Sequence, residues 1–254
     1  MANINQAANG YFGGRSLVQQ SGSKGGARHV FVKFDDIKDD LVFPTGGGQV
    51  MNPFPGVAKI YAGDLMEFRT DENGLKGKVY ILKTYEAAVA STAKVITLVR
   101  DGYHHIPFVG DVLMVAPSAI GGKGKITNVV AVTKKNDSNG NPVWELTVDT
   151  ALTIAKGDIL VEGTALAETD SSGNTGTMLV GNINAVAAWD YDFMWSEAAD
   201  PTDDDEFDAA RYFLTPTLRG TMYIKKMSPM PDCVKALNIA NINGWFRIDA
   251  LNKK

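Results

Sequence analysis

The sequence has few of the residue types from which metal centres and disulfide frameworks are built. Its 254 residues include one cysteine, Cys233, and three histidines. One cysteine excludes an internal disulfide and any zinc site made of several cysteines, and three histidines are too few for a histidine-rich site. We therefore expect no metal and no cofactor, and we interpret Cys233 as a small hydrophobic residue.

Positive charge and long hydrophobic runs are scarce as well. The 25 lysines and arginines are outnumbered by 29 aspartates and glutamates, which gives a net charge of −4. Proteins that bind nucleic acid or a membrane surface broadly need a basic field, so we expect neither as a partner. No apolar run approaches the roughly 20 residues of a membrane helix, and the polar first six residues are not typical of a signal peptide.

Motifs for catalysis are missing too. Residues 121–127 resemble a phosphate-binding loop, but Ala119 stands where its first glycine is needed and Ile126 where its Ser or Thr would bind magnesium. There is no Gly-x-Ser-x-Gly elbow for a nucleophilic serine. Carboxylates are plentiful enough for a glycosidase pair, but none lies in a local context that favours a raised pKa. We therefore expect no catalytic, cofactor-binding or metal-binding residues, and no enzyme.

Two further candidates for metal binding are weak. His104 and His105 are adjacent, and adjacent side chains on a strand point to opposite faces, while His29 lies far away in the sequence. We expect these histidines to be loop or surface residues. The acidic run at residues 200–208 lacks the glycine and the final glutamate of an EF-hand loop, which leaves at most weak calcium binding.

Charge is distributed unevenly towards the C-terminus. Residues 190–210 contain nine acidic and no basic residues, whereas residues 211–254 contain eight basic and two acidic ones. One interpretation is a solvated acidic loop beside an ordinary basic segment. The other is an acidic segment that docks on the basic surface of a neighbouring copy or another partner, because opposite charges set the orientation and rate of association.

The glycine-rich composition of the first 55 residues predicts an extended N-terminal arm. Nine glycines lie within the first 48 residues, and such glycine density disrupts regular structure. Only residues 29–34 have the pattern of a strand. Because the arm has few apolar residues to pack against its own body, we expect a neighbouring molecule to hold it.

Residues 56–180 predict the main body, a small β-barrel or β-tulip. Its segments are rich in Val, Ile, Thr, Tyr and Leu and are bounded by turn residues, and Asn and Gly at 71–74 and 136–142 predict two hairpin turns. Because the strands are short and joined by loops, we expect a closed or nearly closed barrel. The expected strands are residues 57–61, 64–69, 78–85, 94–99, 111–116, 125–134, 143–149 and 158–162.

A short pattern recurs within this body. Gly-Asp precedes an apolar run at Gly63, Gly110 and Gly157, and these glycines are 47 residues apart both times. The pattern is typical of a tight turn that enters a buried strand, but its shortness leaves open whether it marks an internal repeat or only shared turn chemistry. It predicts that the following apolar side chains are buried, namely Leu65, Val112, Leu113, Ile159 and Leu160.

Residues 181–254 predict a small α+β unit. Pro201 and the acidic residues after it are typical of a helix start, and apolar spacing continues the helix as far as Leu214, before Pro216. Strands are expected at residues 221–226 and 245–248, and residues 234–239 fit either a strand or a helix.

An aromatic stripe lies at the start of this unit. Trp189, Tyr191, Phe193 and Trp195 alternate with other residues, which predicts a strand with one aromatic face. Three roles are open for this face: it packs on the barrel, it forms an interface with another protein, or it stacks on a sugar. Tyrosine and tryptophan are enriched at protein interfaces.

Several segments together resemble a known family. They are residues 55–68, with Gly-Asp-Leu-Met-Glu-Phe, residues 77–85, Gly-Lys-Val-Tyr-Ile-Leu-Lys-Thr-Tyr, and residues 155–163, Ala-Lys-Gly-Asp-Ile-Leu-Val-Glu-Gly. After a glycine-rich arm, this texture is similar to the head auxiliary proteins (decoration or head-fibre proteins) of tailed bacteriophages, crAss-like phages in particular. The resemblance covers about residues 55–180, and the C-terminal unit has no counterpart in the minimal decoration proteins.

The resemblance implies a structural protein of the virion. It would be made in the host cytoplasm, bind the outer surface of the capsid and stabilise the head, without catalysis. Its expected partners are the major capsid protein lattice and neighbouring copies of itself, with a threefold arrangement as one option. The alternative function is a carbohydrate-binding or adhesion module that uses the aromatic face from Trp189 to Trp195.

Overall fold

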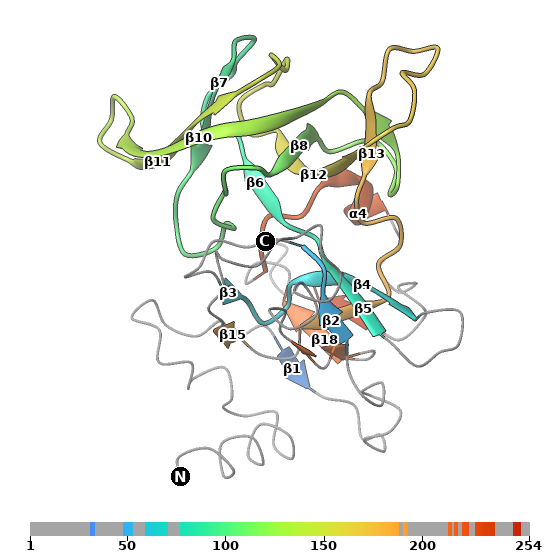
Figure 1. The fold of residues 1–254 in the computed structure, drawn as a ribbon. Coiled ribbons are helices and arrows are strands. Elements are labelled where there is room, and N and C mark those ends of the chain that lie inside the picture. Colours follow the sequence, from blue (N-terminus) through green and yellow to red (C-terminus); the bar gives the residue numbers. More distant parts are fainter. Residues whose placement is uncertain are drawn as a thin grey trace. The chain divides into compact units, whose positions relative to one another are not determined.

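The structure, a computed structural model, is mainly β among the described residues, as the sequence predicts (Figure 1). One short helix, α4 (Asp232–Ala236), occurs among the described residues. No helix in the described part of the chain is long and apolar enough to cross a membrane. The described residues are 31–33, 48–52, 59–70, 77–187, 190–192, 213–214, 216–217, 220–223, 227–236 and 246–249.

The chain divides into two units. One, which we call the sheet unit, comprises Met1–Ile81, Ile183–Met227 and Asn238–Lys254; the other, which we call the barrel unit, comprises Leu82–Asn182 and Ser228–Leu237. The domain boundaries that the sequence suggests, after residues 55 and 180, stay a prediction.

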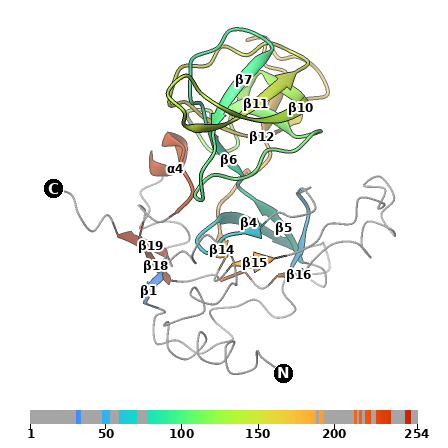
Figure 2. The same ribbon diagram turned by 90° about the vertical axis from the view of Figure 1, so that its left-hand side faces the viewer.

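The barrel unit is built on an antiparallel sheet of eight strands that curls strongly into a half-barrel (Figure 2). The strand order is β7-β11-β10-β8-β12-β13-β9, and β6 also pairs with β12. An isolated bridge also joins Ala87, the residue after β6, to Leu98 of β7. The strands are β6 (Thr84–Glu86), β7 (Val95–Val99), β8 (Val112–Val115), β9 (Lys123–Gly124), β10 (Ile126–Asn136), β11 (Pro142–Val148), β12 (Ile159–Ala165) and β13 (Gly176–Met178).

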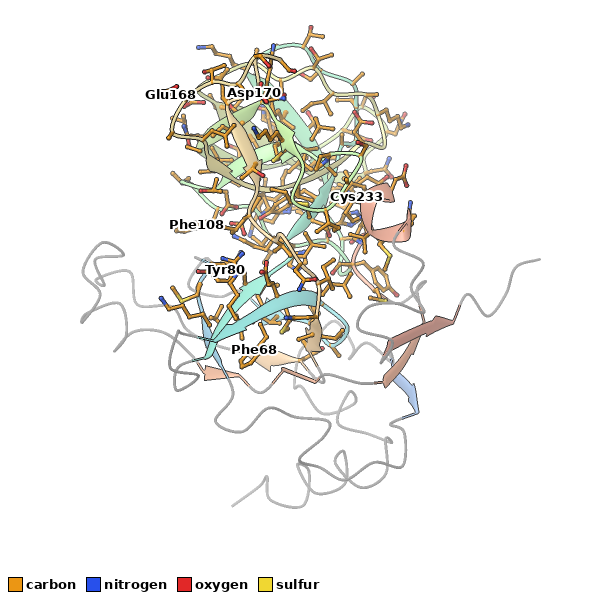
Figure 3. The ribbon with its side chains drawn as sticks, turned by 90° about the vertical axis from the view of Figure 1, so that its right-hand side faces the viewer. Phe68, Tyr80, Phe108, Glu168, Asp170 and Cys233 are labelled. Atoms are coloured by element: carbon orange, nitrogen blue, oxygen red, sulfur yellow. The ribbon has the colours of Figure 1, made fainter. Side chains whose placement is uncertain are left out.

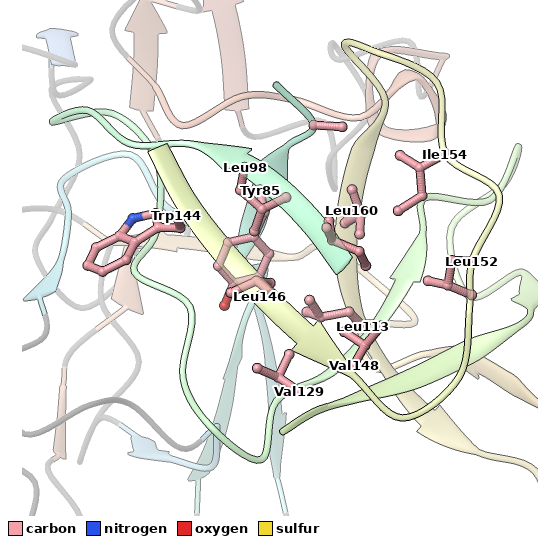
Figure 4. Packing of buried hydrophobic residues seen from close by; sticks show 12 residues of the cluster. Tyr85, Leu98, Leu113, Val129, Trp144, Leu146, Val148, Leu152, Ile154 and Leu160 are labelled. Carbon is pink, nitrogen blue, oxygen red and sulfur yellow. The ribbon is translucent and has the colours of Figure 1, made fainter. Parts of the chain in front are cut away.

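Alternation along the strands directs one face of the sheet into a core. In β7, Ile96 and Leu98 are buried whereas Val95 is exposed, as expected when successive side chains point to opposite faces. Figure 4 shows the inward side chains of the barrel unit meeting around Tyr85 and Leu146. Trp144 lies at the margin of this core, where Arg100 and Lys134 each approach its ring at 5.5 Å.

The expected core residues are only partly confirmed. Leu65, Leu113 and Leu160 are buried, but Val112 and Ile159 are half-buried, so the expectation for these two was wrong. Each is the first residue of its strand. In both strands the residues that follow are buried in succession, Leu113 and Met114 in β8 and Leu160 and Val161 in β12, so only the first residue, next to the turn, is partly exposed.

The three Gly-Asp pairs form the same turn. Gly63, Gly110 and Gly157 have positive φ values of 86°, 100° and 86°, which glycine adopts without a steric penalty. In each turn the Asp carboxylate accepts a hydrogen bond at 2.7–2.8 Å from the backbone N–H three residues earlier. The glycine N–H also donates to the carbonyl of one residue elsewhere in the chain, and the N–H of that same residue donates to the Asp carbonyl. This residue is Ala187 for the first turn, Val129 for the second and Ala87 for the third. The recurring pattern therefore reflects shared turn chemistry.

Two hairpin loops of the barrel unit also share one conformation. Residues 137–141, Asp-Ser-Asn-Gly-Asn, join β10 to β11, and residues 170–174, Asp-Ser-Ser-Gly-Asn, lie between β12 and β13. In each loop the Asp carboxylate accepts hydrogen bonds from two backbone N–H groups and from the side-chain amide of the final Asn. The glycine has a positive φ of 82° or 77°. The predicted hairpin at residues 136–142 is confirmed.

The sheet unit contains three smaller sheets. Its six-stranded sheet has the order β16-β2-β5-β4-β14-β17, β15 pairs with β3, and a three-stranded sheet has the order β1-β18-β19. Val50, Ile60, Met66, Val79, Ile81, Ala185 and Ala187 form its core. The strands are β1 (Phe31–Lys33), β2 (Gly48–Val50), β3 (Lys59–Ile60), β4 (Leu65–Thr70), β5 (Gly77–Ile81), β14 (Ala185–Ala187), β15 (Tyr191–Asp192), β16 (Phe213–Leu214), β17 (Pro216–Thr217), β18 (Gly220–Tyr223) and β19 (Phe246–Asp249).

Two segments of the predicted arm belong to this unit. Residues 31–33 pair with β18, and Gly48–Val50 lies between β16 and β5 in the six-stranded sheet. The expected strand at residues 29–34 is thus confirmed at its centre. Apart from residues 51 and 52, the rest of the arm lies outside the described part of the chain, so the arm itself stays a prediction.

The C-terminal residues match the sequence prediction in part. The strands expected at 221–226 and 245–248 correspond to β18 and β19, and the ambiguous segment at 234–239 overlaps the end of α4. Leu214 was expected in a helix but lies in β16, paired with Gly48. That long-range pairing overrides the local helical spacing. Residues 201–212 lie outside the described residues.

Candidate functional site

The glycine-rich segment at residues 121–127 leads into a strand. Gly121 has a positive φ of 69°, Lys123–Gly124 forms β9, and β10 begins at Ile126. Lys123 lies 3.8 Å from a carboxylate oxygen of Asp170. No helix follows in this described stretch, so its amides do not converge on a phosphate as a helix N-terminus would.

The two adjacent histidines are buried, which corrects the expectation that they are surface residues. His104 is 7% exposed and His105 is 2% exposed. His104 lies 2.7 Å from Asp101 and 3.3 Å from Glu86, whereas His105 Nδ1 accepts a hydrogen bond from the backbone N–H of Thr84. They do lie in a loop and have different partners, as expected. His29 lies outside the described residues.

Three other features that the sequence singled out are Cys233, the acidic run at residues 200–208 and the aromatic stripe. Cys233 lies on α4 (Figure 3), is buried, and burial raises the pKa of its thiol, so the interpretation as a small hydrophobic residue is confirmed. The acidic run at residues 200–208 lies outside the described residues. Of the aromatic stripe, only the backbone of Tyr191 is described, in β15. The described residues contain no group of three or more His, Cys, Asp or Glu that could hold a metal.

A cluster of buried charged side chains is the most distinctive polar feature of the barrel unit. Lys83 Nζ lies 3.0 Å from Asp111 Oδ1 and 2.6 Å from Glu162 Oε1. The side chains of Lys83 and Asp111 are fully buried and that of Glu162 is 6% exposed. On its other oxygen, Asp111 accepts hydrogen bonds from the Tyr85 hydroxyl at 2.9 Å and from the Phe108 N–H at 2.8 Å. We call these five residues the Lys83 cluster.

Strand pairing explains why these side chains meet. Thr84 of β6 pairs with Val161 of β12 in antiparallel register, so Lys83 and Glu162 are the next residues along the two segments. Glu162 in turn pairs with Leu113 of β8, and Asp111 is in the Gly-Asp turn that precedes β8. Three segments distant in sequence therefore bring one cation and two carboxylates to the same place.

The cluster shifts the pKa values of its basic and phenolic groups. Burial alone lowers the pKa of Lys83, but the carboxylates of Asp111 and Glu162 reverse this effect and raise it above its usual value. Burial, with the charges of Asp111 and Glu162, raises the pKa of Tyr85 well above its usual value. Lys83 is thus held as an ammonium, and Tyr85 as a neutral hydroxyl that donates its hydrogen bond.

An unpartnered hydroxyl and an aromatic contact adjoin the cluster. Thr84 Oγ1 is buried without a hydrogen-bond partner among the described residues, and its backbone N–H donates to His105. The His105 ring meets the Tyr85 ring edge-on, with centroids 6.4 Å apart. Thr84 and His105 are themselves 1% and 2% exposed, so both are buried beside the cluster.

Our sequence reasoning did not find the Lys83 cluster. Two signals were available: Lys83 directly follows the apolar run Val79-Tyr80-Ile81-Leu82, inside a segment expected to be a strand, and Asp111 belongs to one of the three Gly-Asp pairs. A lysine in a buried strand needs a charged partner. Nothing local identifies Glu162 as that partner, because it lies far along the chain and meets Lys83 only through the pairing of β6 with β12.

Comparisons with known proteins give no assignment. No protein-family model matches the sequence, and no curated protein and no solved structure matches it significantly. Function must therefore be argued from the residues and their geometry.

Proposed function

We propose that this chain is a structural virion protein that binds the outer surface of a phage capsid and reinforces the head. The proposal starts from the resemblance to head auxiliary proteins over residues 55–180. The β-rich body agrees with what that resemblance implies. The major capsid protein lattice is the proposed partner, and neighbouring copies of the chain are further contacts.

The observation that supports a protein partner is an outward row of small and apolar side chains on three neighbouring strands. Val95 of β7 pairs with Thr147 of β11, and Thr147 pairs with Ala131 of β10. All three are exposed, and the adjacent Val130, at a bulge in β10, is 56% exposed. Exposed apolar groups on rigid strands favour a contact with another protein, because burying them removes apolar area from water.

The first test is the abundance of the chain in purified particles of the phage that encodes it. A copy number comparable with that of the major capsid protein, measured by quantitative mass spectrometry, is expected. Absence from the particles, or a few copies per particle, would contradict a reinforcing role on the capsid lattice.

The second test examines the outward row directly. Val130→Asp should weaken binding of the purified protein to capsids that lack it by at least tenfold in a co-sedimentation assay, because it places a charge in the proposed contact. Val109→Asp is the matched control: Val109 is also exposed (51%) but lies in the turn before β8, outside the row. Equal binding by both variants would reject this row as the contact surface. Binding to a glycan array with no binding to capsids would favour the alternative adhesion module.

A further inference from the structure

The Lys83 cluster places an amine, a carboxyl group and a second carboxylate in direct contact inside the barrel unit. The Lys83–Asp111 and Lys83–Glu162 distances are 3.0 Å and 2.6 Å, and the three side chains are 0%, 0% and 6% exposed. Reacting groups held this close avoid most of the entropic barrier of a bimolecular encounter. Exclusion of water also favours neutral products over separated charges.

The two oxygens of Asp111 have different surroundings. Oδ1 faces Lys83, whereas Oδ2 accepts hydrogen bonds from the Tyr85 hydroxyl and the Phe108 N–H. Two donors directed at one oxygen stabilise the negative charge that develops there when a nucleophile adds to the carboxyl carbon. This arrangement leaves Oδ1 as the oxygen that departs.

We propose that Lys83 and Asp111 condense into an intramolecular isopeptide bond, with Glu162 as the group that carries the protons. The bond joins Lys83 Nζ to Asp111 Cγ and releases Oδ1 as water. It forms within one chain and needs no cofactor, oxidant or second substrate.

The protons and electrons of this reaction balance. The Lys83 ammonium transfers one proton to the Glu162 carboxylate, and Glu162 delivers it to Oδ1, so that Asp111 becomes a neutral carboxyl group. The amine lone pair then adds to Cγ of Asp111, and a second proton from Nζ reaches Oδ1 by the same route. The C–Oδ1 bond breaks, water leaves, and the third proton stays on the new amide nitrogen. Glu162 ends as the carboxylate with which it began.

Glu162 is suited to this transfer by position. Its Oε1 is 2.6 Å from Nζ, within the range required of a general base. Because the two carboxylates hold Lys83 in the ammonium form, an internal base is needed before the amine can attack. Tyr85 stays protonated, since burial and both carboxylates raise its pKa, and so remains a donor to Oδ2.

The rival interpretation is a permanent ion pair. A buried lysine with two carboxylates is also a stable structural arrangement once its partners are in place. The two interpretations differ in covalent mass. An isopeptide bond removes one water molecule from the chain, whereas an ion pair leaves the mass unchanged.

The decisive experiment is intact-mass spectrometry of the purified full-length chain after denaturation. We expect a mass lower by one water than the sequence requires. Digestion with trypsin should then yield a branched peptide that joins Lys83 to Asp111, with no cleavage after Lys83. A chain with the full sequence mass, or a cross-link between other residues, would overturn the proposal. This result depends on the wild-type chain alone, so it does not rely on any variant folding, or on the proposed capsid function.

Two variants assign the roles. Glu162→Gln should reduce the cross-linked fraction at least tenfold, because the amide does not accept the ammonium proton. Lys83→Arg keeps the positive charge and should abolish the mass loss. Glu145→Gln is the matched control, since Glu145 pairs with Lys135 on the exposed surface, and it should leave the cross-link complete. A Glu162→Gln variant that cross-links as fully as the wild type would overturn the role of Glu162.

Discussion

Asp111 has two structural roles in the barrel unit, one through its backbone and one through its buried side chain. Its carbonyl and N–H complete the second Gly-Asp turn, while its side chain contacts Lys83, Tyr85 and Phe108. Asp111 therefore stabilises the turn that precedes β8 and also neutralises the buried charge of Lys83. Removing its carboxylate would leave Lys83 with one fewer counter-charge in a site where unpaired charges are costly.

A first prediction at this scale concerns the core. Leu160→Ala should lower the free energy of unfolding by about 2–5 kcal/mol, because Leu160 is fully buried and the change leaves a cavity. Chemical denaturation monitored by fluorescence measures the loss. Val109→Ala, at a 51% exposed position, should change stability by less than about 0.5 kcal/mol. A small effect at Leu160 would show that this part of β12 does not face the core.

A second prediction separates backbone strain from crowding. Gly110→Ala should destabilise the protein by roughly 1–2 kcal/mol, the cost of a left-handed conformation for a residue with a Cβ atom. An added Cβ meets no atom within 4 Å at either Gly110 or Gly102, but only Gly110 has a positive φ, of 100°. Gly102→Ala is therefore the control and should have little effect on thermal unfolding. Equal losses at both positions would argue against the turn geometry.

A third prediction concerns the pH at which Asp149 titrates. Hydrogen bonds from the side chain and backbone of Asn128, with help from Thr127 and Thr150, lower its pKa to about 2. A lowered pKa stabilises the fold above the unfolded pKa, and this contribution is lost as the pH falls from about 4 to about 2. Carboxyl NMR should show the low pKa in the wild type and a higher one in Asn128→Ala. Because Asp149 is exposed, the effect on stability should be small. An unchanged titration in the variant would contradict the role of Asn128.

At the scale of elements, the barrel unit uses the same turn chemistry more than once. The burial pattern differs between its strands, since β7 alternates whereas β8 and β12 bury residues in succession. The turns that precede β8 and β12 and the two hairpin loops all use glycines with positive φ and aspartates that accept backbone hydrogen bonds. Such loops fix the register of a hairpin, because the turn determines which residues face each other.

The two Asp-Ser-x-Gly-Asn loops provide a prediction at this scale. Exchanging residues 137–141 with residues 170–174 should leave the melting temperature nearly unchanged, because both loops form the same hydrogen bonds. Asp137→Ala removes the acceptor of these bonds and should lower the melting temperature of the exchanged and the native chain alike. A large loss on exchange alone would mean that each loop depends on its own surroundings.

At the scale of the whole molecule, the chain combines two β units with a long glycine-rich N-terminal segment. Residues 31–33 and 48–52 of that segment take part in the sheet unit, whereas residues 1–26 precede every described strand. Ordering glycine-rich chain costs about 1–2 kcal/mol per residue in backbone entropy, and contacts with a partner would have to offset that cost.

The last prediction follows from this division. Deleting residues 1–26 should leave the melting temperature similar but weaken attachment to the capsid, and the segment should be sensitive to protease in the free protein and protected on the particle. Calorimetry and co-sedimentation with capsids measure the two effects separately. Unfolding of the truncated protein would make the segment an internal structural element. Unchanged attachment would remove it as the anchor and leave the acidic and basic C-terminal segments as the next candidates.

Local patterns were sufficient to predict most strands of this protein. Alternating apolar residues predicted strands that overlap β3 to β8 and β10 to β12, although the segment at 78–85 is interrupted between β5 and β6. Glycine before aspartate predicted the turns at Gly63, Gly110 and Gly157, because both the positive φ and the carboxylate acceptor are properties of the residues themselves. The short strands β9, β13 and β14 carry too few residues to show a period.

Tertiary structure decided what depends on residues far apart in the chain. The burial of Leu160 rather than Ile159, the placement of Leu214 in a strand and the burial of His104 and His105 follow from pairing with distant segments. The Lys83 cluster is the clearest case, because no local pattern places Glu162 beside Lys83 and Asp111. Only the register of β6, β8 and β12 does so, since strand pairing sets which side chains meet while sequence spacing sets only which face each one occupies.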